Sequence, residues 1–160
     1  MNRKLLGILV IALLFIACGV SKPGASGRGS KSEINYGSPT KKQELQDANT
    51  FKVDTYSNDS TYGYTIENPI MVGKSEGGNG PLNERRFLNA LMGPNGEPII
   101  YSRLGSCCQF KTKNGLLGDS GFLDKYSIMH KGLDKEVILY INMYDSDVLQ
   151  IPVGFKKKIK

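Results

Sequence analysis

The fold is decided by residues 122–144, which read FLDKYSIMHKGLDKEVILYINMY. Over 122–129 and again over 137–144 the side chains alternate with a period of two, which is typical of strands whose two faces differ. The link 130–135 contains Gly132 and has about the length of an antiparallel hairpin loop. This stretch therefore predicts a β-hairpin.

Upstream of the hairpin, residues 81–92 predict the main helix. Pro81 suits a first helical turn, Leu88 and Leu91 follow helical spacing, and Gly93 is typical of a helix end. Short strands are expected at 51–53, at 70–72, from Ile99 onward and at 148–153. The chain of 160 residues allows one domain and is too short for a (β/α)₈ barrel of about 250 residues. We therefore expect an α+β fold with a small, mainly antiparallel sheet and one main helix.

The N-terminus has the pattern of an export signal. Positive residues 3–4 precede a charge-free stretch, 5–17, that is shorter than the ~20 apolar residues of a membrane-spanning helix. The sequence Phe-Ile-Ala-Cys at 15–18 resembles a bacterial lipobox, in which the cysteine receives a diacylglyceryl group and fatty acids such as palmitate. We therefore predict a signal peptide at 1–17 and lipidation of Cys18. An ordinary signal peptide or a short uncleaved anchor are the alternatives.

Charge and composition divide the remaining chain. Residues 18–50 are rich in Gly, Ser and Lys and poor in apolar side chains, so we expect a flexible tether there. The α+β domain is expected at 51–155, followed by a basic tail at 156–160. The net charge of +6 arises mostly from the tether and the tail, while 51–155 is slightly acidic. A nucleic-acid partner is therefore not expected, because such proteins carry basic surfaces on the folded part.

Several blocks together resemble a group of small Bacteroidota lipoproteins whose function is unsettled. The blocks are Tyr62-Gly63-Tyr64, Asn68-Pro69-Ile70, NERRFLNAL at 83–91, GPNGE at 93–97, RLGSCC at 103–108 and ILYINMY at 138–144. Members of the group often carry the label 2-dehydro-3-deoxyphosphooctonate aldolase. That enzyme is a cytoplasmic (β/α)₈ barrel acting on phosphorylated metabolites, so we reject the label for a short, exported, antiparallel chain.

The resemblance also bears on location. Surface-displayed lipoproteins of this bacterial group often carry acidic residues just after the lipidated cysteine, whereas here the first acidic residue is Glu33. We therefore expect the lipid to hold the domain in the outer membrane on its periplasmic side. Asp59-Ser60-Thr61 resembles the periplasmic O-glycosylation sites of these bacteria, which makes Ser60 a candidate modification site, with a plain turn as the alternative.

Cys107 and Cys108 are the sharpest local feature, since they are the cysteines left once Cys18 carries lipid. Adjacent residues of an extended strand point to opposite faces, and a disulfide between them would bring the Cα atoms closer than the usual ~4.4–6.8 Å. We expect one buried and one partly exposed cysteine at a strand-edge turn. A reducible disulfide, or a thiol enzyme that pairs a cysteine with His130, is the alternative.

The leading hypothesis is a lipid-anchored, non-enzymatic module for binding or envelope assembly. Its partners would be the membrane, through the lipid, and another envelope protein or a glycan. No cofactor is expected and no catalytic residue is assigned. No metal site is expected either, because a single histidine cannot build a multi-histidine zinc motif. The second hypothesis, from another class, is a thiol-dependent redox protein or enzyme centred on Cys107 and Cys108.

Overall fold

The computed structural model describes residues 42–73, 78–116 and 118–159. The predicted signal peptide, Cys18 and the part of the tether before residue 42 lie outside these residues. Within the described part, no helix is both long enough and apolar enough to cross a bilayer.

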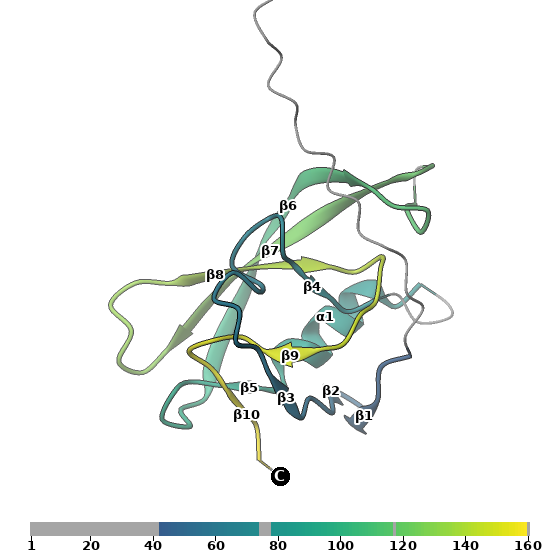
Figure 1. Cartoon of the computed structure of the whole chain (residues 1–160). Helices are drawn as coiled ribbons and strands as arrows, with labels where there is room; N and C mark the ends of the chain where they lie inside the picture. Colours follow the sequence, from purple (N-terminus) through teal and green to yellow (C-terminus); the bar gives the residue numbers. More distant parts are fainter. Residues whose placement is uncertain (1–41, 74–77, 117, 160) are drawn as a thin grey trace, which may run out of the picture. The chain divides into compact units, whose positions relative to one another are not determined.

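A four-stranded sheet forms the centre of the domain, in the order β4 (Ile70–Met71), β8 (Val137–Asn142), β7 (Ser120–His130) and β6 (Ile99–Lys111). β6 and β7 run side by side as a long antiparallel hairpin, and β8 lies antiparallel to β7 (Figure 1). β4 is parallel to β8. The two strands and the hairpin predicted from residues 122–144 are therefore confirmed, as is the α+β class.

Helix α1 (Gly80–Leu88) packs on one face of this sheet. Pro81 lies in its first turn, where a missing N–H costs no hydrogen bond. Phe87 and Leu88 are fully buried in the core that they share with Leu139 and Ile141 of the sheet. The same core also contains Phe51, Val53, Ile70, Val72, Ala90, Leu91, Tyr126, Ile128, Leu149, Ile151 and Phe155.

The helix is shorter than the sequence predicted. We expected it to continue to Met92, but it ends at Leu88 and the chain then forms strand β5 (Leu91–Met92). β5 pairs antiparallel with β10 (Lys156–Lys157), and the Lys158 N–H donates to the Ala90 carbonyl at 2.7 Å. The extended backbone buries Leu91 and forms these hydrogen bonds. Pairing with a distant strand therefore stabilises this segment more than one further helical turn would. Part of the segment expected as a basic tail is therefore a strand with exposed side chains.

Two further pairs of short strands flank the core. β1 (Leu45–Asp47) is antiparallel to β2 (Thr50–Phe51), and α1 holds their turn, because Arg86 donates to the Ala48 carbonyl and Asn89 to the Asn49 carbonyl. Regular structure thus begins before residue 51, within the range expected as tether. β3 (Thr55–Tyr56) is parallel to β9 (Gln150–Ile151), which lies in the stretch where a strand was expected at 148–153.

A buried polar cluster fixes the chain after β8. Asn142, fully buried, donates to Asp145 at 2.9 Å and accepts the N–H groups of Tyr144 and Asp145. The second oxygen of the buried Asp145 carboxylate accepts bonds from Thr112 at 2.7 Å and Asn114 at 2.8 Å. The end of the β6–β7 hairpin is thereby joined to the end of β8.

Candidate functional site

Cys107 and Cys108 form a disulfide within the edge strand β6. Their Cα atoms are 3.8 Å apart, the spacing of any two residues joined by a trans peptide bond. In the pairing of β6 with β7, Cys107 lies opposite Leu123 and Gln109 lies opposite Phe122. Cys108 has no partner residue of its own on β7 and is therefore the extra residue of a β-bulge. Its φ of 56° turns its side chain toward that of Cys107. The expectation of two separate cysteines is therefore wrong, because a bulge overrides the strand's alternation.

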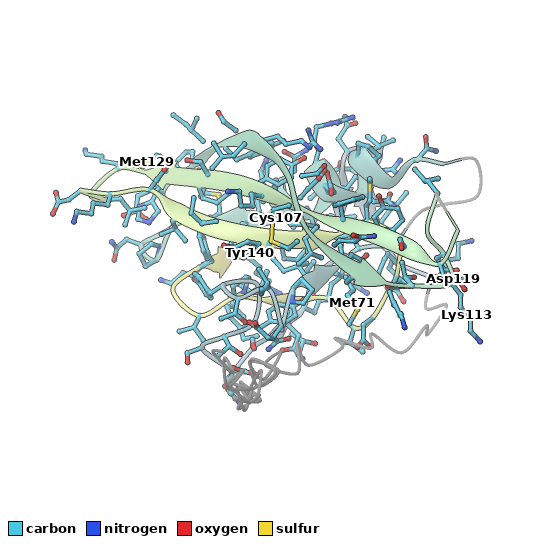
Figure 2. The ribbon with its side chains drawn as sticks, turned by 90° about the horizontal axis from the view of Figure 1, so that it is seen from above. Met71, Cys107, Lys113, Asp119, Met129 and Tyr140 are labelled. Atoms are coloured by element: carbon cyan, nitrogen blue, oxygen red, sulfur yellow. A yellow bond between two sulfur atoms is a disulfide. The ribbon has the colours of Figure 1, made fainter. Side chains whose placement is uncertain are left out.

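The disulfide lies on the sheet face opposite α1. Cys107 and Cys108 are half-buried and pack beside a small apolar cluster whose buried members are Phe110, Leu123 and Tyr144. Figure 2 shows the sulfur–sulfur bond over the middle of the long strands, with Tyr140 on β8 labelled nearby. Ile66, Met71, Tyr140 and Met143 complete the same cluster.

His130 lies far from the two cysteines. It ends β7 opposite Ile99, whereas Cys107 pairs with Leu123, seven residues earlier on β7. At the rise per residue of a strand this separation is about 23 Å. The structure therefore rules out the Cys–His pair that we considered as the basis of a thiol enzyme.

On the α1 side of the same strands, the sheet carries a network of ionisable groups. The buried Asp124 carboxylate accepts bonds from Arg103 at 2.7 and 2.8 Å and from Ser106 at 2.6 Å. Next to it, the buried Glu84 of α1 accepts the Tyr126 hydroxyl at 2.8 Å. Among the described residues, the second oxygen of Glu84 has no hydrogen-bond partner.

The electrostatics of this network favour a protonated Glu84. Burial first, and then the negative charge of Asp124, raise the pKa of Glu84 from 4.5 to about 8. Burial, together with the adjacent Glu84, also raises the pKa of Tyr126. Groups with perturbed pKa values often mark functional sites. Glu84 and Tyr126, however, lie between α1 and the sheet, inside the core, where their ionisation chiefly affects the free energy of unfolding.

An open cleft of about 400 Å³ lies at the β4 edge of the sheet, between the 57–69 segment and residues 147–150. Its lining residues are Ser57, Asp59, Tyr62, Asn68, Pro69, Met71, Asp147, Val148 and Gln150. Met71 also belongs to the apolar cluster beside the disulfide, so the cleft and the disulfide share one sheet face.

Hydrogen bonds tie the two walls of the cleft together. The Gln150 N–H donates to the Tyr62 hydroxyl oxygen at 3.2 Å, the Ser57 N–H to the Ile151 carbonyl at 2.9 Å, and the Asp147 N–H to the Met71 carbonyl at 3.2 Å. Because these bonds join one wall to the other, they fix the spacing of the two walls in the absence of a ligand.

A second set of bonds fixes the polar side chains on one wall. One oxygen of Asp59 accepts the N–H and the hydroxyl of Thr61 at 2.8 and 2.7 Å, which lowers the pKa of this carboxyl group. Asn68 donates to the other oxygen of Asp59 at 2.9 Å and to the Thr61 hydroxyl at 3.0 Å. Ser60 is exposed between these residues and stays a predicted O-glycosylation site.

No protein-family model, no curated protein and no solved structure matches this chain. In the described ranges no group of three or more His, Cys, Asp or Glu side chains could hold a metal ion.

Sequence reasoning missed the cleft and the Glu84–Asp124 network. The cleft combines residues about 80 to 90 positions apart, such as Tyr62 and Gln150, and no local motif signals such an encounter. Glu84 occupies a helical position where a solvent-exposed acid is ordinary, and only α1 packing on the sheet buries it. The turn-forming composition of residues 57–61 was the one signal in the sequence for this wall of the cleft.

Proposed function

We propose that this chain is a lipid-anchored protein of the bacterial envelope whose domain is a binding module, with its ligand in the cleft between residues 57–69 and 147–150. The lipobox-like sequence ending at Cys18 supports the anchor. The chain's resemblance to Bacteroidota lipoproteins supports a place in the outer membrane. The absence of acidic residues directly after Cys18 supports its periplasmic side.

The observation that carries the proposal is the preorganised cleft. Its volume of about 400 Å³ lies in the ~300–1,000 Å³ range of small-molecule sites. Main-chain bonds such as Ser57 to Ile151 and Asp147 to Met71 fix its walls, so ligand binding would not have to order them.

Binding is favoured over catalysis by where the reactive groups lie. Both sulfur atoms of Cys107 and Cys108 are bonded to each other, so neither is a thiolate nucleophile in this state. His130 lies at the end of β7, far from the two cysteines, and Glu84 and Asp124 are buried between α1 and the sheet. The aldolase label carried by similar lipoproteins stays rejected, because the fold is a four-stranded mixed sheet with a single helix in its described part.

The anchor is tested by mass spectrometry of the mature N-terminus and by cell fractionation. We expect a diacylglyceryl group and acyl chains on Cys18, and we expect Cys18→Ser to move the protein out of the membrane fraction. An unmodified Cys18, or membrane association that survives the substitution, would contradict the anchor.

The cleft is tested with a fluorescent reporter, because the chain contains no tryptophan. Val148→Trp places a single indole at the cleft, and Val153→Trp is a matched control, since the two valines are 42% and 45% exposed and Val153 is not in the lining. Solubilised envelope extract should shift the emission of the first variant and protect it from acrylamide quenching, with no effect on the second. Equal responses, or none, would refute binding in the cleft.

A second candidate function, thiol–disulfide exchange, is favoured by the disulfide itself. Cys107 and Cys108 are half-exposed on an edge strand, where a thiolate of a dithiol reductant can approach. In such an exchange the disulfide takes up two electrons and two protons to give two thiols, while the reductant becomes a disulfide. Redox titration of the Cys18→Ser protein against dithiothreitol tests this role. A pair that stays oxidised throughout would exclude it.

A further inference from the structure

We infer that the cleft recognises a neutral saccharide, by hydrogen bonds to its hydroxyl groups and by apolar contact with a ring face. This inference rests on the proposed function, because it names the ligand class of the same cleft. Three properties of the lining carry it: its unused donors and acceptors, its charge and its apolar surface.

The lining presents both donors and acceptors that have no partner inside the described part of the domain. Asn68 uses both of its N–H groups on Asp59 and Thr61, which leaves its carbonyl oxygen as a fixed acceptor. The Tyr62 oxygen accepts the Gln150 N–H, so its own proton is available to a ligand. The Gln150 side-chain amide adds a donor and an acceptor. A sugar hydroxyl both donates and accepts, and matches such a mixture.

Tyr62 remains a neutral donor at any physiological pH. Burial, the largest cause, raises the pKa of its hydroxyl to about 12. Asp59, in contrast, stays an acceptor, because its bonds from Thr61 lower the pKa of its carboxyl group.

The charge of the lining argues against an anionic ligand. It contains two carboxylates, Asp59 and Asp147, and neither Lys, Arg nor His. Sites for phosphate or carboxylate groups carry Arg, Lys or backbone N–H groups aimed at the anion, and here a ligand anion would meet like charges. Asp147 binds the Val148 N–H with one oxygen and leaves the other available.

Pro69, Met71 and Val148 give the cleft an apolar side. The C–H face of a sugar ring packs on such surfaces, while its hydroxyl groups reach the polar rim. Since sugars in open sites bind through a few hydrogen bonds, we expect dissociation constants between about 1 μM and 1 mM.

The inference is tested with an array of neutral, uronic-acid-containing and sulfated glycans, followed by calorimetric titration of the protein with Val148 intact, using the glycans that bind. We expect binding to neutral glycans and none to their charged analogues. Tyr62→Phe removes the hydroxyl and should weaken neutral-glycan binding about fivefold. Tyr64→Phe is the matched control, because Tyr64 bonds to the Val153 carbonyl outside the lining and its substitution should leave affinity unchanged.

Asp147→Asn tests the charge argument separately. Asparagine can still accept the Val148 N–H, but it removes one of the two negative charges, so uronic-acid-containing glycans should begin to bind. Thermal unfolding of each variant verifies that the fold is retained.

Failure of the inference can be told apart from failure of the proposed function. If envelope extract shifts the Val148→Trp emission while no neutral glycan binds, the saccharide inference is overturned and the binding module stands. If neither extract nor glycan has an effect, both are overturned. Equal weakening by Tyr62→Phe and Tyr64→Phe, or preferred binding of charged glycans, would also overturn the saccharide inference.

Discussion

The pH dependence of stability provides a sharp test of the Glu84 environment. Glu84 holds its proton up to a pKa of about 8 in the folded domain but loses it near 4.5 once the chain unfolds. Between these values the folded state binds more protons, so the free energy of unfolding falls as pH rises, by about 1.4 kcal/mol per unit in mid-range. Glu84→Gln keeps the size and the Tyr126 contact but cannot ionise. The variant should therefore gain about 2.5 kcal/mol relative to the wild type between pH 5 and pH 7.

Urea denaturation of both proteins at half-unit pH intervals measures this difference. Titrating groups that do not interact with Glu84 cancel, because they behave alike in the two proteins, whereas Asp124, Arg103 and Tyr126 belong to the measured difference. Glu97→Gln is the control: its bonds from Asn95 lower the pKa of Glu97, so above pH 5 only its weak attraction to His130 is left to vary, and its substitution should change the slope far less than Glu84→Gln does. A wild-type curve that runs parallel to the Glu84→Gln curve from pH 5 to pH 8 would refute the burial of a protonated carboxyl group beside Asp124.

The remaining predictions concern the packing around this site and the sheet. Arg103→Leu should cost about 2 kcal/mol in urea titrations at neutral pH, because it leaves the buried Asp124 carboxylate without its cation. Asn142→Ala should cost about 3 kcal/mol by the same assay, since it removes one donor and an acceptor of two main-chain N–H groups. Gly121→Ala should lower the unfolding free energy by about 2 kcal/mol in thermal scans, because its Cβ would lie 2.9 Å from the Phe110 ring. An unchanged stability in any of these variants would contradict the packing described for that residue.

The strands of the sheet could be predicted because their side-chain pattern is local. Residues 122–129 and 137–144 alternate with period two and are joined by a link of hairpin length, and both became strands in the same sheet. The end of the helix could not be predicted in this way. Leu91 fits a helical stripe equally well, and its segment becomes a strand through pairing with β10, some 65 residues later.

The two cysteines show the same distinction at the candidate site. Their adjacency in sequence suggested opposite faces of a strand, and the reasoning was correct for regular backbone. The positive φ of Cys108 depends on the bulge in the β6–β7 pairing, and no residue next to it in the sequence predicts that bulge. The cleft likewise depends on the parallel contact of β3 with β9, between segments about 95 residues apart.

The sequence alone determined the properties that short-range patterns encode: the slightly acidic body and the two alternating strands. The signal peptide at 1–17 and the lipidation of Cys18 stay predictions from the same kind of local pattern. Tertiary structure decided where the helix stops, whether Cys107 and Cys108 join, and which polar groups share a cleft or a buried network. The physical reason is that propensity and periodicity act over a few residues. Burial and hydrogen-bond satisfaction are settled only when distant segments meet.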